Sequence, residues 1–146
     1  LIPESSFQKI VWSNLEIVFK VLVESLAVFG IAGLIMKEPF GLVAAAIAVY
    51  TLFSFLLLGI NYLSLRWTGA DISAGLLIFI YTIAVIVIML PGLVAAIVIG
   101  SMVEGTGALI GLGALALWEL LAAIGCFALS RGVLHNSDMP VLRTGK

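Results

Sequence analysis

Residues Ile72–Val103 read ISAGLLIFIYTIAVIVIMLPGLVAAIVIGSMV and contain no charged side chain over 32 positions. A transmembrane helix needs about 20 predominantly apolar residues to cross roughly 30 Å of hydrocarbon. This segment exceeds that length, and Pro91-Gly92 interrupts it beyond its middle. We therefore take lipid to be the solvent in which the chain folds.

The composition of the whole chain agrees with this interpretation. Of its 146 residues, 63% are hydrophobic and 10% are charged, and the mean hydropathy is +1.29. Soluble domains average about 45–50% apolar and about 25% charged residues. The net charge of -1 leaves no basic patch for phosphates, which argues against a nucleic-acid partner. The single cysteine, Cys126, lies in an apolar run and is predicted to be a small buried hydrophobe.

The pattern predicts an all-α, polytopic membrane protein with about four transmembrane helices. The expected spans are Asn14–Met36, Phe40–Leu65, Ile72–Val103 and Ala108–Ser130. They form a membrane domain over residues 14–131, followed by a polar cytoplasmic tail over 132–146. Residues 1–13 are expected to form a short amphipathic interfacial helix on the cytoplasmic side, because Phe7, Ile10 and Val11 share one helical face. The alternative is an ordinary start of a longer membrane helix.

The third span is expected to break at Pro91 and Gly92. As one straight helix its 32 residues would measure about 48 Å, which is too long for a simple crossing. Proline removes a helical hydrogen bond, and the adjacent glycine loosens the helix. We expect a long helix followed by a shorter offset or re-entrant helix, Leu93–Val103, packed against the glycine-rich start of the fourth span, Gly107–Gly113.

The distribution of positive charge predicts the orientation. With four spans, the termini and the middle loop share one side of the membrane. That side carries Lys9, Arg66, Arg131, Arg143 and Lys146, whereas the other side carries Lys37. The positive-inside rule therefore places both termini in the cytoplasm, in an integral protein of the cell membrane.

Three charged residues inside the spans form the candidate polar site: Lys20, Glu24 and Glu119. Glu24 and Glu119 lie at similar predicted depths and could approach each other or flank Lys20. An intramembrane carboxylate is a functional-site hypothesis, since it can bind a proton or a cationic substrate. The competing interpretation is structural: Lys20 pairs with Glu24 along its own helix, and with Glu119 across an interface.

Motifs for catalysis or cofactor binding do not occur in the sequence. There is no G-x-x-x-x-G-K-[ST] motif, and GTGALIGLG at Gly105–Gly113 lacks the spacing of a dinucleotide-binding loop. His135 stands alone, without neighbours at metal-ligand spacing. We therefore predict no catalytic, cofactor or metal site, and a protein that is not itself an enzyme.

Several polar landmarks resemble an ABC exporter family of Gram-positive bacteria. They are I-P-x-S-x-F-x-K at Ile2–Lys9, GINYLSLRWTG at Gly59–Gly69, LPG at Leu90–Gly92 and RGVLHNSDM at Arg131–Met139. The resemblance implies the C-terminal portion of an ABC-2-like permease, with further spans before Leu1 and a separate P-loop ATPase subunit. Phe7, Lys9 and Arg66, on the predicted cytoplasmic side, are candidates to contact that ATPase.

Two other functions remain open. One is a proton-coupled secondary transporter in which Glu24 and Glu119 exchange a proton for substrate. The other is a structural membrane subunit without a transport path, acting within a homo- or hetero-oligomer. Small-residue packing faces such as Gly107 and Gly111 favour the latter.

Overall fold

The computed structural model describes residues 6–68 and 73–130, and this part of the chain consists of four α-helices without a strand. Each helix is long and apolar enough to cross a membrane. The predicted all-α fold class with four spans is confirmed. The helices are α1 (Ser6–Met36), α2 (Phe40–Thr68), α3 (Ala74–Ser101) and α4 (Gly107–Ser130).

The first helix differs from the prediction at its start. The structure has one continuous helix from Ser6, so the amphipathic segment forms the first turns of α1 and is not a separate interfacial helix. The reason is local, since no proline or glycine lies between Ser6 and Asn14 to end a helix there. Similarly, α2 continues three residues beyond Leu65 and takes Arg66 and Trp67 out of the predicted loop.

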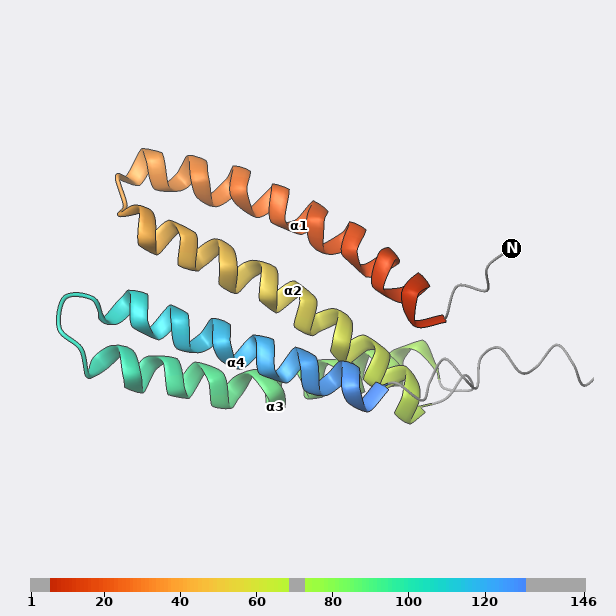
Figure 1. The fold of residues 1–146 in the computed structure, drawn as a ribbon. Coiled ribbons are helices and arrows are strands. Elements are labelled where there is room, and N and C mark those ends of the chain that lie inside the picture. Colours follow the sequence, from red (N-terminus) through yellow and green to blue (C-terminus); the bar gives the residue numbers. More distant parts are fainter. Residues whose placement is uncertain (1–5, 69–72, 131–146) are drawn as a thin grey trace, which may run out of the picture.

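Two tight turns join the helices into antiparallel pairs, and both lie at the same end of the bundle (Figure 1). After α1, Lys37 adopts a left-handed conformation with φ 55°, and the Glu38 N–H donates to the Gly33 carbonyl over 3.0 Å. This is a Schellman motif, and Pro39 follows it where the helix cannot continue. Between α3 and α4, Gly105 has φ 80°, which favours glycine.

The helices lie side by side in the order α1, α2, α4, α3 (Figure 1). The core sits between α2 and α4, where Leu56, Ile60 and Leu63 meet Ala123 and Cys126. Cys126 is thus buried, as predicted. Many large apolar side chains of α1 and α3 point outward instead, which suits contact with lipid tails; they include Phe19, Leu34, Phe79 and Ile97.

The third span is a single helix with Pro91 inside it, in place of the two helices that we expected. The expected contact of its second half with the start of α4 is confirmed. A Cβ added to Gly107 would collide with the Gly100 carbonyl, and one added to Gly111 would lie 2.8 Å from the Ala96 carbonyl. The glycines therefore let the two backbones approach closely.

Candidate functional site

Lys20 and Glu24 form an ion pair along α1. The Lys20 Nζ lies 3.9 Å from the Glu24 Oε1, and the two side chains are 77% and 58% exposed. They are four residues apart, the spacing at which neighbouring turns present side chains on one face. The pairing is the one described by the structural interpretation of these residues, and both side chains are largely exposed.

Glu119 lies apart from that pair, in the interior. Its exposed fraction is 1%, and its Oε2 has no hydrogen-bond partner among the described residues. No ion pair joins it to Lys20 in the part of the chain that the structure describes. The structure therefore joins Lys20 with Glu24 and leaves Glu119 alone, rather than forming one cluster of three.

Glu119 lines a cavity of about 350 Å³ to which all four helices contribute. It is the single charged side chain in the lining, which is otherwise apolar and aromatic. The Phe29 ring of α1 meets the Tyr50 ring of α2 edge-on at a centroid distance of 5.7 Å. The remaining lining residues are Ala46, Val49, Phe53, Met89, Leu112 and Leu115. We call this space the Glu119 pocket.

Trp118, the residue that precedes Glu119, packs against α3 beside Pro91. Pro91 has no N–H, so the carbonyl of Val87 loses its helical donor. The next carbonyl, that of Ile88, accepts a hydrogen bond from the Trp118 indole N–H over 2.8 Å. Gly92 is buried beneath the same indole, where any added Cβ would collide with the ring. Sequence reasoning identified Pro91 and Gly92 but gave Trp118 no role.

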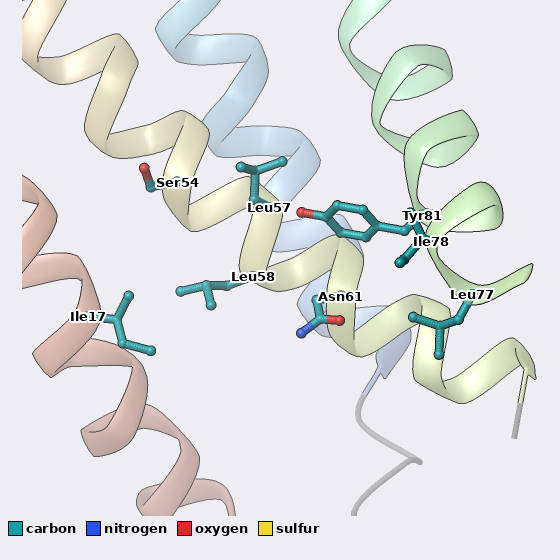
Figure 2. A pocket seen from close by; sticks show the side chains of 8 residues that line it. All are labelled: Ile17, Ser54, Leu57, Leu58, Asn61, Leu77, Ile78 and Tyr81. Carbon is teal, nitrogen blue, oxygen red and sulfur yellow. The ribbon is translucent and has the colours of Figure 1, made fainter. Parts of the chain in front are cut away.

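A second cavity, of about 370 Å³, lies between α1, α2 and α3 (Figure 2). Its apolar lining is interrupted by the polar side chains of Ser54, Asn61 and Tyr81. The Tyr81 side chain extends from α3 toward α2, as Figure 2 shows. The Ser54 hydroxyl donates to the Tyr50 carbonyl over 3.1 Å. This cavity contains no charged side chain in its lining, so it offers weaker recognition chemistry than the Glu119 pocket.

Polar contacts between α1 and α2 hold the outermost helix in place. The Tyr62 hydroxyl donates to the buried Asn14 Oδ1 over 3.3 Å, and the hydroxyls of Ser25 and Thr51 lie 3.4 Å apart. Lipid tails cannot form hydrogen bonds with polar side chains, so these side chains bond to each other across the interface between the helices. We assign these residues to helix association, since each takes part in a polar contact between α1 and α2.

The candidate ATPase-contact residues share one end of the molecule. Phe7 and Lys9 lie in the first turns of α1, and Arg66 lies in the last turn of α2, opposite the two tight turns (Figure 1). This common placement agrees with the topology expected from the sequence. His135 and the polar tail lie outside the described residues.

Comparison with known proteins identifies the family. A family model described as "Putative ABC exporter" matches residues 1–138, and the chain belongs to this family. No curated protein and no solved structure matches. Family membership and four membrane-capable helices together are consistent with a component of a membrane transporter.

Proposed function

We propose that this chain, as a member of the Putative ABC exporter family, is the membrane-spanning permease portion of an ABC exporter. The observation that carries the proposal is the family match over residues 1–138, which covers all four helices. The permease moves its substrate with energy from ATP, and the bundle supplies the path through the bilayer.

A separate subunit supplies the ATPase. The family match implies a partner ATPase, and the 146 residues contain no P-loop motif of their own. The end of the bundle that carries Lys9 and Arg66 is the proposed docking surface for this subunit. By the positive-inside rule, this end faces the cytoplasm and the two tight turns face outward.

Charge reversal at the two ends of the bundle tests this function. The chain is purified from its native membrane with any P-loop ATPase that accompanies it, and the ATP hydrolysis of the complex is measured in lipid nanodiscs. Lys9→Glu and Arg66→Glu should release the ATPase or lower hydrolysis. Lys37→Glu, in the turn at the opposite end, is the matched control and should change neither the association of the ATPase nor the rate of hydrolysis.

The proposal fails if no P-loop ATPase accompanies the wild-type chain, or if the three reversals act alike. Proton-coupled transport is the second candidate function, and the burial of Glu119 without a partner for Oε2 among the described residues favours it. It would be supported by transport in sealed vesicles that a pH gradient drives without ATP and that Glu119→Gln abolishes. The exposed, paired Glu24 offers this alternative no comparable support.

A further inference from the structure

The Glu119 carboxyl group is buried, and the described residues do not provide all of its hydrogen bonds. Its Oε2 is buried and accepts no hydrogen bond from residues 6–68 or 73–130, and the adjacent cavity is lined by apolar and aromatic side chains. Buried polar groups in proteins are nearly always paired, and an unpaired buried charge is costly. The pocket therefore retains a strong acceptor that is not used in holding the bundle together.

The structure shows no ion pair between Glu119 and a cation of the described residues. Lys20 pairs with Glu24 on the exposed side of α1, and Lys37 lies in the turn between α1 and α2. Glu119 lies near the middle of α4, far along the helix from either end. Neither lysine therefore neutralises Glu119, and a bound ligand is a source of positive charge for this carboxyl group.

The pocket lining favours one kind of positive charge. Phe29, Tyr50 and Phe53 contribute aromatic rings, whose faces attract cations, and the aliphatic lining suits apolar substituents. A volume of about 350 Å³ falls within the usual range of small-molecule sites, roughly 300–1,000 Å³. A small hydrated metal ion would find one carboxylate and no cluster of ligands among the described residues.

We propose that the Glu119 pocket binds a lipophilic organic cation, a protonated or quaternary ammonium or phosphonium ion with apolar substituents. Glu119 neutralises the charge, Phe29, Tyr50 and Phe53 provide the aromatic surface, and the aliphatic lining residues contact the apolar groups. The inference rests on the proposed exporter function, for which it names a substrate class.

Equilibrium binding of tetraphenylphosphonium to the purified full chain in lipid nanodiscs tests the proposal. Tetraphenylborate, an anion of the same shape, is the control ligand. The wild-type chain should bind the cation saturably and the anion far more weakly. Glu119→Gln should weaken cation binding about tenfold or more, because it removes the negative charge that attracts the phosphonium ion in a low-dielectric site. Glu119→Asp should retain more affinity than Glu119→Gln, and Phe53→Leu should weaken binding without abolishing it.

Glu104→Gln, in the exposed loop between α3 and α4, is the matched control and should bind as the wild-type chain does. Circular dichroism and thermal unfolding of each variant confirm that the bundle remains folded. The proposal is overturned if the wild-type chain shows no saturable cation binding, if tetraphenylborate binds equally well, or if Glu119→Gln has wild-type affinity. The assay contains neither ATP nor ATPase, so a failure of the proposed exporter function would leave its result unchanged.

Discussion

The indole N–H of Trp118 donates a hydrogen bond to the backbone carbonyl of Ile88 over 2.8 Å and thereby ties α4 to α3 beside Pro91. A proline inside a membrane helix frees backbone groups that lipid cannot satisfy. Trp118 supplies a donor at this point, and Gly92 leaves room for its ring. This contact joins the two helices one residue beyond the Val87 carbonyl that Pro91 leaves without its helical donor, within the single helix α3.

Removal of that donor should weaken the bundle. We expect Trp118→Phe to lower the free energy of unfolding by about 1 kcal/mol, since it keeps an aromatic ring but leaves the Ile88 carbonyl without the indole donor. Unfolding in mixed micelles measures the difference. Trp12→Phe is the control, because Trp12 is exposed at the outer face of α1. Equal effects of the two substitutions would contradict the role assigned to Trp118.

The close approach of α3 and α4 should depend on particular glycines. A Cβ at Gly111 would lie 2.8 Å from the Ala96 carbonyl, and this backbone atom cannot move aside cheaply. Gly111→Ala should therefore destabilise the bundle by about 1–3 kcal/mol, as overpacking does. Gly113→Ala, where an added Cβ meets nothing within 4 Å, should be neutral or slightly stabilising. Thermal unfolding of both variants in the same detergent decides the matter.

Neutral replacement of Glu119 should stabilise the protein. A buried carboxyl group whose oxygen has no partner in the described part of the chain is retained at a cost in stability, so Glu119→Leu should raise the free energy of unfolding by about 1–3 kcal/mol. Chemical denaturation in micelles provides the measurement. Glu24→Gln, at an exposed position, should change the free energy of unfolding by less than about 1 kcal/mol. A large loss of stability in Glu119→Leu would instead indicate that Glu119 holds the helices together.

The orientation of the bundle can be determined by cysteine labelling. In a Cys126→Ala background, Glu104→Cys in the α3–α4 loop should react with a membrane-impermeant maleimide added to intact cells. Ser6→Cys, at the start of α1, should react only after the membrane is permeabilised, because the opposite end of the bundle faces the cytoplasm. The reverse pattern of labelling would invert the proposed topology.

The four spans could be predicted from sequence because lipid imposes a simple requirement. A segment that crosses hydrocarbon must be apolar for about 20 residues and must satisfy its backbone internally, and both conditions are visible in composition. The pairing of Lys20 with Glu24 was also predictable, since one helix sets their separation. The same local reasoning located Pro91 and the close packing of Gly107 and Gly111, although it divided α3 where the structure keeps one helix.

The separation of Glu119 from Lys20 and Glu24 emerged only from the packed bundle. Position along a helix gives depth in the membrane, but the direction in which a side chain points depends on how the helices rotate against one another. In this bundle α4 turns Glu119 inward to a shared pocket, whereas α1 turns Lys20 and Glu24 outward. The indole contact beside Pro91 likewise emerged only from the packed bundle, because Trp118 is distant from Ile88 in sequence and near it only after packing.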